Sequence, residues 1–573
     1  MKKNEKTTKK NEKTANKGKK SSSLGYEVWA SDQSNSVPGQ QSLGMKGSFL
    51  WIFDSDGVKK QLSGQDEAAA LTCTPGKAYG PCEAFEIFPQ ELNQFGADGP
   101  TGNQLKDLPG FGRLHGVLLD PQNRYVNANF FAPGGGFIGI INVETKEAIA
   151  LFRLSKFSTS NERSVHMSFW SLDGMAILCA NLHGKAIERI NVGRDSDGTI
   201  TSVEFDRSAT ISFGTNISIL EEAAFFQGTN AFGRPLIGDI VGDYSNAELG
   251  DLTPNGYCKE DGCDSSDRPP TGWVNNVPIC TIPSSEDNLY VNFGGGGLLI
   301  LDLKATPMSI LGEYDSKTYN GASCGGVQVD QQMFMNAGVS AGASGFDQST
   351  FTLYSFDDGA YSDGPNPPNN PPPKISFKDE TNTNTIGNVD GRDTPNTSGQ
   401  IAGKTTRRDA HGIISTVNGK YLHAFDRIQN TVDVFNVKTL ERIKYDLTSI
   451  DGRSGRPVDP DETGPCLAKS VTDDIDLVLN DPSPDLLGIS PDGKYIFVAL
   501  LGPSPVSVTH SAQGSCPGVG IIQLTNKGMR GKLVDIIRTT NTIDTAPLPQ
   551  IVGGIQYKGA ERSDIHGTIV VPK

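Results

Sequence analysis

Short apolar runs alternate with tight polar turns along most of the chain, and the same order recurs several times. Each unit has an apolar strand, a turn of Asp, Asn and Gly residues, a second apolar strand, a polar segment and a third strand. A strand, an Asp/Asn-Gly turn and a second strand together form a strong signal for a β-hairpin. The clearest copies begin at Gly112, Arg163, Arg408 and Asp485, and looser copies begin at Ile279 and Ser323. Units of about 40 residues with four strands each are typical of β-propeller blades.

The two ends of the chain supply a seventh unit between them. The final segment RSDIHGTIVVPK matches a first strand but stops where the hairpin turn should follow. Near the N-terminus, LGYEVWASDQSNS and SFLWIFDSDG match the missing second and third strands. A blade built from both termini closes the ring and leaves no open sheet edge. The sequence therefore predicts an all-β fold, a single seven-bladed β-propeller over residues 24–573 that is closed by pairing of N- and C-terminal strands.

Several segments depart from the compact repeat. We expect long loop insertions at about residues 55–111, 200–273, 345–407 and 451–482. Such insertions either cap the mouth of the central channel or are neutral elaborations of the surface, and the run SILEEAAFF in the second one predicts a short helix. Residues 1–22 hold nine Lys, no aromatic residue and no apolar periodicity, so they are expected to form a disordered, Lys-rich tail.

Charge and hydropathy exclude two classes of partner. The 573-residue chain has a formal net charge of −15, and many of its basic residues lie in the tail, so the remaining chain is strongly acidic. Nucleic-acid binding requires a basic face, so we expect no nucleic-acid partner. No apolar run approaches the roughly 18 residues that a membrane-spanning helix needs, so we expect no membrane span.

The cysteines indicate an oxidising compartment. Three pairs lie in loops rich in Gly, Pro and Asp, where a thiol has no packing role: Cys73/Cys82, Cys258/Cys263 and Cys466/Cys516. Close loop pairs of this kind are typical of disulfides in secreted or periplasmic proteins. Reduced thiols in a cytoplasmic protein are the alternative, because the N-terminal segment has no apolar stretch of the secretory type and does not itself indicate export.

One position recurs in all seven units and carries residue types that bind metals. In each internal unit it lies ten positions before the residue taken to open the second strand, and in the split unit it heads the final strand. Its occupants are four His, two Cys and one Asp: His115, His166, Cys280, Cys324, His411, Asp485 and His566. The chain has only seven His, so four in one register exceed what composition alone would produce.

Propeller geometry gives this register a meaning. First strands of the blades run side by side along the central channel, so equivalent residues should form a ring near one mouth. Imidazole, thiolate and carboxylate groups are ligands of transition metals. We expect a bound transition metal, with copper or iron favoured and zinc as a further option. Its expected ligands are His115, His166, His411 and His566, with Cys280, Cys324 and Asp485 as additional candidates.

Other interpretations of the same residues stay open. Each imidazole can instead be a hydrogen-bonded packing group at the entry of its hairpin. Cys280 and Cys324 belong to adjacent blades and can form an interblade disulfide. Asp485 can orient an imidazole rather than bind a metal.

Charged residues precede the four His. Arg113, Arg163, Arg408 and Arg562 stand two to four residues before them, and Asp409 and Asp564 stand two residues before His411 and His566. Arginines at the mouth would bind an anionic substrate, and the two carboxylates would orient imidazoles. Ordinary Arg–Asp pairs that link neighbouring blades are the alternative.

The hairpin motifs, SPDGKYIFVA above all, resemble those of the YVTN-type, lactonase-like seven-bladed propellers, and the resemblance covers most of residues 24–573. The His ring is similar to the copper-binding propeller of nitrous oxide reductase. It also resembles the four-His iron centre of carotenoid cleavage oxygenases and the metal site of selenium-binding, methanethiol-oxidising proteins. These resemblances imply a metal-binding propeller and, if it is an enzyme, an oxidoreductase that acts on a small-molecule substrate at a His-lined channel mouth.

Two other functions are compatible with the sequence. One is a non-catalytic scaffold that holds a protein or glycan partner on one propeller face. The other is a lactonase- or lyase-type enzyme that uses the His as acid/base groups. The P-loop and HExxH motifs of other chemistries do not occur in the sequence.

Overall fold

A computed structural model provides the structure of the protein. The residues it describes are 25–33, 49–74, 76–88, 113–131, 136–157, 163–212, 220–221, 223–241, 250–251, 277–314, 318–319, 321, 324–338, 351–361, 371–379, 408–449, 464–466, 468–469, 478–480, 482–502, 514, 516–539, 551–552, 555–556 and 563–573.

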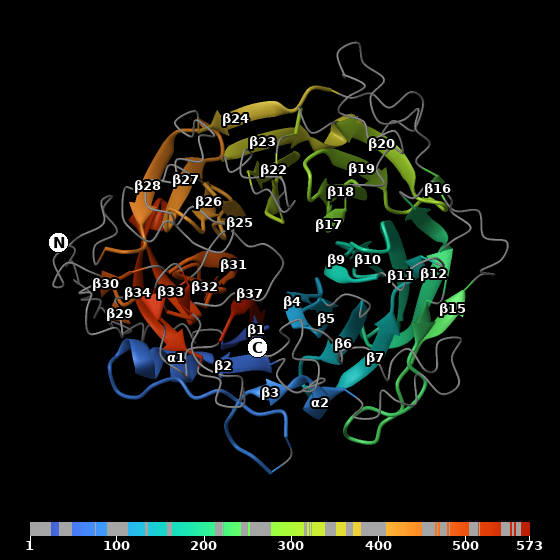
Figure 1. Ribbon diagram of the computed structural model, residues 1–573, viewed down its shortest axis with the longest axis horizontal. Coiled ribbons are helices and arrows are strands. Elements are labelled where there is room, and N and C mark those ends of the chain that lie inside the picture. The colour runs from blue at the N-terminus through green and yellow to red at the C-terminus, as the bar shows by residue number, and fades with distance from the viewer. Residues whose placement is uncertain are drawn as a thin grey trace, which may run out of the picture.

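Seven mostly antiparallel sheets, each of four or more strands, surround a central axis (Figure 1). We number these blades from the one that contains both termini. From the axis outward, blade 1 has β37 (Ile565–Pro572), β1 (Tyr26–Asp32), β2 (Phe49–Asp54) and β3 (Cys82–Glu83). Blade 2 has β4 (Arg113–Leu119), β5 (Tyr125–Phe131), β6 (Phe137–Asn142), β7 (Ala148–Arg153) and β14 (Ala224–Phe225). Blade 3 has β9 (Val165–Trp170), β10 (Ala176–Asn181), β11 (Ala186–Arg194), β12 (Ile200–Ser212), β15 (Asp239–Val241) and β16 (Gly250–Asp251).

The other four blades each have four strands. Blade 4 has β17 (Pro278–Pro283), β18 (Asn288–Phe293), β19 (Leu298–Asp302) and β20 (Ser309–Tyr314). Blade 5 has β21 (Gly326–Val329), β22 (Gln332–Ala337), β23 (Thr352–Asp357) and β24 (Lys374–Lys378). Blade 6 has β25 (Ala410–Ser415), β26 (Tyr421–Asp426), β27 (Thr431–Asn436) and β28 (Arg442–Asp446). Blade 7 has β31 (Pro484–Ile489), β32 (Tyr495–Leu500), β33 (Gly518–Thr525) and β34 (Arg530–Arg538).

Short elements lie between and beside the blades. They are α1 (Ser55–Leu62), α2 (Ala84–Ile87), β8 (Lys156–Phe157), β13 (Leu220–Glu221), η5 (Asp358–Tyr361), β29 (Ala468–Lys469), β30 (Val478–Leu479), η7 (Asn526–Gly528), β35 (Ile551–Val552) and β36 (Ile555–Gln556). No helix within the described ranges is long and apolar enough to cross a membrane.

The predicted closure of the ring is confirmed. Strand β37 at the end of the chain pairs antiparallel with β1 at its beginning, with Trp29 opposite Ile569, and β1 pairs with β2. All seven residues of β1 are buried, because neighbouring blades cover both faces of the sheet. Apolar clusters fill the space between blades; one joins Val28 of blade 1 to Phe497 and Val519 of blade 7.

The repeated turns explain why the hairpins form where the sequence predicts them. In blade 7, the Ser490 hydroxyl accepts hydrogen bonds from the backbone N–H groups of Lys494 (3.1 Å) and Tyr495 (3.0 Å), which closes the turn. Gly493 in the same turn has φ +66°, a left-handed conformation that glycine adopts without steric cost. The SPDGKY motif thus sets the register of its two strands.

Parts of three predicted insertions are blade strands, and the range 55–111 contains β3, the fourth strand of blade 1. The range 200–273 begins with β12, the fourth strand of blade 3, and the range 345–407 contains β23 and β24 of blade 5. The helix expected in SILEEAAFF is wrong for its described residues, which contain β13 and β14. They are extended because β14 pairs with β7, with Phe225 opposite Phe152. The tail at residues 1–22 lies outside the described residues.

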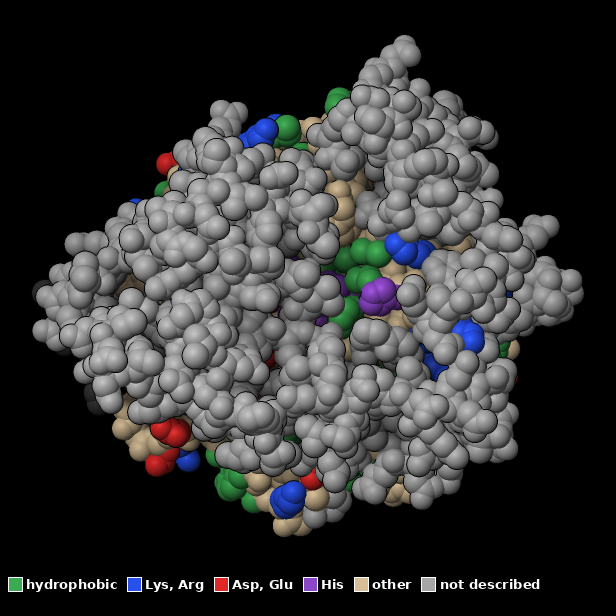
Figure 2. Space-filling view, in the orientation of Figure 1, with side chains coloured by type: hydrophobic (Ala, Val, Ile, Leu, Met, Phe, Trp, Pro, Cys, Tyr) green, Lys and Arg blue, Asp and Glu red, His purple; other side chains and the backbone are tan. Residues whose placement is uncertain are grey.

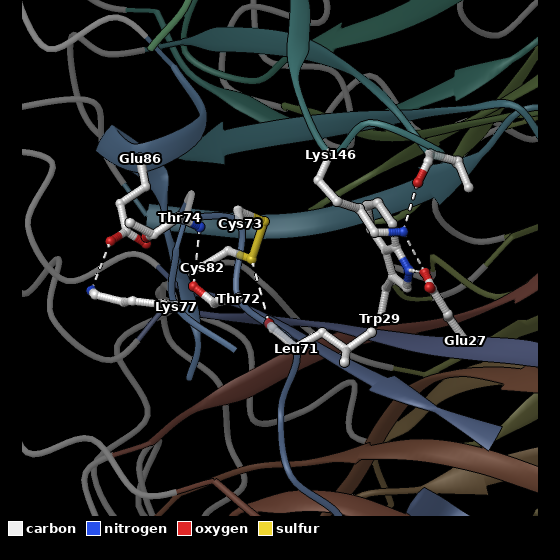
Figure 3. The surroundings of a disulfide bond; sticks show 11 residues. Glu27, Trp29, Leu71, Thr72, Cys73, Thr74, Lys77, Cys82, Glu86 and Lys146 are labelled. Atoms are coloured by element: carbon white, nitrogen blue, oxygen red, sulfur yellow. Dashed lines mark hydrogen bonds and ion pairs between the residues drawn. A yellow bond between two sulfur atoms is a disulfide. The ribbon is translucent and has the colours of Figure 1, made fainter. Parts of the chain in front are cut away.

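Disulfides join two of the three predicted loop pairs. Cys73 and Cys82 are bonded, with Cα atoms 5.1 Å apart, and fix the segment before β3 (Figure 3). Cys466 and Cys516 are also bonded, whereas Cys258 and Cys263 lie outside the described residues. A third disulfide joins Cys280 and Cys324. Disulfides of this kind are typical of an oxidising compartment.

Candidate metal centre

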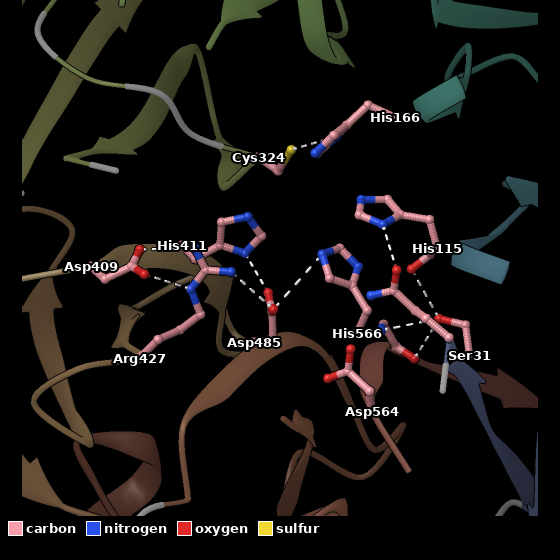
Figure 4. A network of polar contacts seen from close by, with 12 residues as sticks. Ser31, His115, His166, Cys324, Asp409, His411, Arg427, Asp485, Asp564 and His566 are labelled. Atoms are coloured by element: carbon pink, nitrogen blue, oxygen red, sulfur yellow. Dashed lines mark hydrogen bonds and ion pairs between the residues drawn. The ribbon is translucent and has the colours of Figure 1, made fainter. Parts of the chain in front are cut away.

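The seven residues that share one position in the repeat converge around the propeller axis, and Figure 4 labels all of them except Cys280. Each stands at or just before the innermost strand of its own blade. In order around the axis they are His566 (β37), His115 (β4), His166 (β9), Cys280 (β17), Cys324 (before β21), His411 (β25) and Asp485 (β31). The predicted convergence is confirmed, and we call this set the channel ring.

Six of the seven neighbouring pairs in the channel ring are in close contact. The imidazoles of His566 and His115 stack with centroids 3.7 Å apart, and those of His115 and His166 lie 4.4 Å apart. The remaining contacts are the His166 Nδ1–Cys280 Sγ distance of 3.9 Å, the Cys280–Cys324 bond, the His411 Nδ1–Asp485 Oδ1 distance of 2.5 Å and the Asp485 Oδ2–His566 Nε2 distance of 3.8 Å.

Glycines after ring residues allow the inner strands to approach each other this closely. A Cβ atom on Gly412 would lie 2.5 Å from the carbonyl oxygen of Asp485 in the next blade. A Cβ atom on Gly325 would lie 2.2 Å from the carbonyl oxygen of His411. Both distances are too short for real atoms, so a larger residue would force the blades apart. The glycine that follows these ring residues therefore sets the diameter of the ring.

Asp485 is a fully buried carboxylate at the centre of an ion-pair chain. His411 Nδ1 lies 2.5 Å from one of its oxygens, and Arg427 Nη1 donates to the other at 3.1 Å. Arg427 in turn donates two hydrogen bonds to Asp409, at 2.9 and 3.0 Å. Burial alone would raise the pKa of Asp485, but interactions with His411, His566 and Arg427 outweigh it and hold the pKa well below its usual range. Asp485 is therefore ionised at neutral pH.

His115 is oriented by a residue that the sequence analysis missed. Its Nδ1 lies 3.2 Å from the side-chain oxygen of Gln33, which directly follows β1. This hydrogen bond fixes the orientation of the His115 ring, and its donor depends on the tautomer. The contact between Asp485 Oδ1 and His411 Nδ1 likewise fixes the orientation of the His411 ring.

Gln33 and Arg427 could have been found from the repeat. Each follows the Asp that ends the second strand of its blade, namely Asp32 in β1 and Asp426 in β26. The channel ring is defined by one repeat position in the first strands. The equivalent position at the ends of the second strands places Gln33 and Arg427 beside the ring.

Two imidazoles in the ring are uncharged at neutral pH. Burial, together with the neighbouring His566 and His411, lowers the pKa of His166 to about 3. Burial also lowers the pKa of His566 to about 4, although Asp485 acts in the opposite direction. A neutral imidazole is the form that binds a metal ion, so neither group must lose a proton before binding.

Of the two alternatives for Cys280 and Cys324, the structure shows the disulfide, which links blades 4 and 5. It lies against His166, whose Nδ1 is 3.7 Å from Cys324 Sγ (Figure 4). Two sets of three residues bring ligand atoms within 4.8 Å of one another: His411, Asp485 and His566, and His166, Cys280 and Cys324. In the second set both sulfur atoms are committed to the disulfide.

The predicted charged residues have different surroundings. Arg408 is buried and forms ion pairs with Asp379, Asp426 and Asp433, so its charge is already neutralised by residues of blades 5 and 6. Arg163 donates to the carbonyl of Leu154 at 3.0 Å. For Arg408 the structure thus shows the alternative of a pair that links blades. The side chain of Arg113 and all of Arg562 lie outside the described residues.

The two predicted carboxylates act at different distances from the ring. Asp409 holds Arg427 and so acts on the imidazoles through Arg427 and Asp485. Asp564 accepts a hydrogen bond from the backbone N–H of Gly502 at 3.4 Å, which ties the start of β37 to the end of blade 7. On the face shown in Figure 2, histidine and apolar side chains are visible near the centre, over the inner ends of the blades.

Comparisons with known proteins find solved structures with low similarity to this chain. Neither a protein-family model nor a curated protein matches the chain. A similar solved structure is that of the periplasmic gluconolactonase PpgL of Pseudomonas aeruginosa, with 8% identity over 96% of this chain and 99% of that chain and a TM-score of 0.43. A protein from Lactobacillus plantarum has 10% identity over 90% of this chain and 97% of that chain, with a TM-score of 0.41. The dihydro-heme d1 dehydrogenase NirN has 9% identity over 94% of this chain and 74% of that chain, with a TM-score of 0.36. The seven sheets around one axis show that the chain is a seven-bladed β-propeller.

Proposed function

We propose that the channel ring binds a transition metal and that the protein is a metal-binding propeller with redox activity toward a small molecule. The observation that carries this proposal is the contact of 2.5 Å between His411 Nδ1 and Asp485 Oδ1, beside His566. A carboxylate that binds one nitrogen of an imidazole and leaves the other nitrogen for a metal is a recurring arrangement in metal sites. The three residues bring one ligand atom each within 4.8 Å of the others.

The donor set fits such an ion. We propose that His411 and His115 direct Nδ1 to Asp485 and Gln33, which leaves Nε2 of each imidazole to bind a cation. His566 is neutral and stacks on His115, which brings a further imidazole to the same place. Nitrogen-rich sites of this kind suit copper, iron and zinc. A bound copper or iron ion would supply electron transfer to or from a substrate.

The protein residues have three tasks in this proposal. Asp485 balances the charge of the cation, and Arg427 holds Asp485 in place from the opposite side. His115 and His411 present their lone pairs in fixed orientations. Burial of the ring excludes bulk water, which strengthens the electrostatic interactions within it. We further propose that the protein works in a secreted or periplasmic location, which the three disulfides among the described residues favour.

Metal analysis tests the proposal. We expect one equivalent of copper or iron in the purified protein and its loss in a His411→Ala/His566→Ala double variant. His423→Gln is the matched control, because His423 is a buried histidine that is hydrogen-bonded to Tyr445 and Gly528 instead of the ring. Absence of bound metal after incubation with copper and iron salts, in protein with native circular dichroism, would overturn the proposal.

The contact between His411 and Asp485 also supports a second candidate function. A buried Asp–His pair also serves as a general base, so His411 and Asp485 can activate water for hydrolysis of a lactone. The two functions differ in their response to chelation. Hydrolysis that survives removal of all metal and is lost in His411→Ala would favour the hydrolase, whereas activity that disappears with the metal favours the metal centre.

A further inference from the structure

The Cys280–Cys324 disulfide occupies the part of the channel ring opposite Asp485 and His566. It joins the first strand of blade 4 to the segment just before the first strand of blade 5. Its two sulfur atoms lie 3.9 and 3.7 Å from a single atom, Nδ1 of His166. The three potential ligand atoms all lie within 4.8 Å of one another, so two sulfurs and one nitrogen already face the same small volume.

His166 is ready to act as a ligand. Its Nδ1 faces both sulfur atoms, at 3.9 Å from Cys280 and 3.7 Å from Cys324. It is also hydrogen-bonded to the backbone of Ile279, the residue before Cys280, which ties its orientation to the strand that carries one of the sulfurs. The imidazole therefore keeps its position relative to Cys280 whether or not the disulfide is intact.

The surroundings of the sulfurs are apolar. Phe131, Met167, Leu182 and Ile279 pack in one cluster with both cysteines, and Cys324 is only 5% exposed. In such surroundings the reduced pair stays as neutral thiols, and removing both protons would be costly unless a cation neutralises the two thiolates. Since metal binding itself removes the protons of the thiols, a metal ion relieves this cost.

We propose that the Cys280–Cys324 disulfide masks a second metal site, which appears when the disulfide is reduced and which binds Zn²⁺ or Cu⁺ through both sulfurs and His166. An external dithiol supplies two electrons and two protons and is itself oxidised to a disulfide. The products are the thiols of Cys280 and Cys324, and binding of the metal ion releases their two protons to solvent. Two Cys and one His with an open fourth position is a ligand set known for zinc.

This site does not depend on the function proposed for His411, Asp485 and His566. It uses different ligand atoms and exists only in the reduced protein, whereas the other site is complete in the oxidised protein. Metal binding at one site can therefore be measured separately from metal binding at the other site. If both sites are real, the redox state of the surroundings sets how many metal ions one propeller carries.

The test compares Zn²⁺ binding by the oxidised full-length chain and by the chain reduced with a dithiol that is then removed without oxygen. We expect reduction to add one bound equivalent of Zn²⁺, and Co²⁺ used as a probe to show thiolate charge-transfer absorption. The additional equivalent should disappear in Cys280→Ser/Cys324→Ser. It should persist in the matched control Cys466→Ser/Cys516→Ser, which removes another buried disulfide.

A second variant keeps the proposal falsifiable if the double Cys variant folds poorly. His166→Gln leaves the disulfide in place. It should lower the Zn²⁺ affinity of the additional site by at least about 10-fold, because the loss of a residue that only orients a ligand already has an effect of that size. Asp485→Asn should leave the additional site unchanged, which separates it from the proposed copper or iron centre. Equal Zn²⁺ binding before and after reduction, or a gain that persists in Cys280→Ser/Cys324→Ser, would overturn the inference.

Discussion

His411 Nδ1 and Asp485 Oδ1 lie 2.5 Å apart across the junction of blades 6 and 7. Both side chains are buried, and Arg427 holds the second oxygen of Asp485 from within blade 6. The carboxylate is thus fixed between a cation and an imidazole, so it cannot turn away from His411. This rigidity makes Asp485 the residue whose removal most directly tests the metal centre.

Asp485→Asn should weaken metal binding while the ring stays assembled. Asn keeps the shape of the side chain but loses the charge that orients His411 and that balances a cation. Loss of an orienting carboxylate typically reduces metal affinity by about 10- to 100-fold. Titration with Cu²⁺ followed by calorimetry measures the change.

The control for this variant is Asp492→Asn, a partly exposed Asp in the turn of blade 7 that pairs with Lys494. It should leave the affinity unchanged. Breaking a buried ion pair also costs about 3–5 kcal/mol of stability, because Arg427 then loses a partner. Thermal unfolding of Asp485→Asn therefore has to be recorded beside the titration. An unchanged Cu²⁺ affinity in a folded Asp485→Asn protein would argue against the role given to Asp485.

Metal binding should also stabilise closure of the propeller. His566 lies on β37, which closes the ring against β1, and its imidazole stacks on His115 of the next blade. A metal ion held by these residues binds only the closed ring. At a free metal concentration 100-fold above the dissociation constant, such binding adds about 2.7 kcal/mol of stability. Differential scanning calorimetry with and without metal should show a higher Tm.

His566→Ala separates this effect from nonspecific metal binding. The variant should show little or no rise in Tm with metal, because it lacks the ligand on the closing strand. An equal rise in His566→Ala and in the unmodified protein would place the metal elsewhere.

The sequence predicts the blades because each one carries its own local signals. The turn chemistry of SPDGKY and the apolar strands around it are contained within a few residues, and the register of the ring follows by comparing copies. Even the closing strand could be predicted. The C-terminal segment matches a first strand without a hairpin partner, and β1 and β2 supply the missing second and third strands of that blade. A repeat allows long-range contacts to be predicted, since the same position in each copy has the same place relative to the axis.

What the sequence did not predict depends on contacts between copies. Arg427 and Gln33 directly follow second strands and reach the ring because neighbouring blades bring Asp485 and His115 to them. The choice between a disulfide and two free ligands at Cys280 and Cys324 depends on the distance between two blades, which no spacing along one chain reveals. Similarly, β14 was expected to be helical because its pairing with β7 is not visible in its own residues.

The disulfides should differ in their contribution to stability. Cys466 and Cys516 are separated by 50 residues, whereas Cys73 and Cys82 are separated by only nine. Cross-linking a longer segment restricts the unfolded chain more strongly. Replacing both members of a pair by Ser should therefore lower the free energy of unfolding more for Cys466/Cys516, by about 1.5 kcal/mol in the chain-entropy treatment. Denaturant titration measures both values, and equal losses would contradict the prediction.

The pH dependence of stability should contain a contribution from a histidine outside the ring. His423 is fully buried in β26, where it is hydrogen-bonded to Tyr445 at 3.1 Å and to the carbonyl of Gly528 at 2.8 Å. Burial lowers its pKa from 6.5 to about 4, which outweighs the opposite effect of Gly528. Between these two values the unfolded chain binds a proton that the folded protein does not. Stability is therefore lost as the pH falls from about 6.5 toward 4, by up to about 1.4 kcal/mol per pH unit from this group.

His423→Gln removes this contribution and leaves those of the ring. Gln can still donate a hydrogen bond to Gly528, and His166 and His566 titrate in both proteins, so their effects cancel in the comparison. We expect the variant to be less stable than the unmodified protein at pH 7. The difference in their free energies of unfolding should be smaller by about 2 kcal/mol at pH 5, because only the unmodified protein contains a histidine that folding keeps neutral. Denaturant titrations at the two pH values measure it. Parallel pH profiles would contradict the prediction, because they would mean that His423 is protonated as easily in the folded protein as in the unfolded chain.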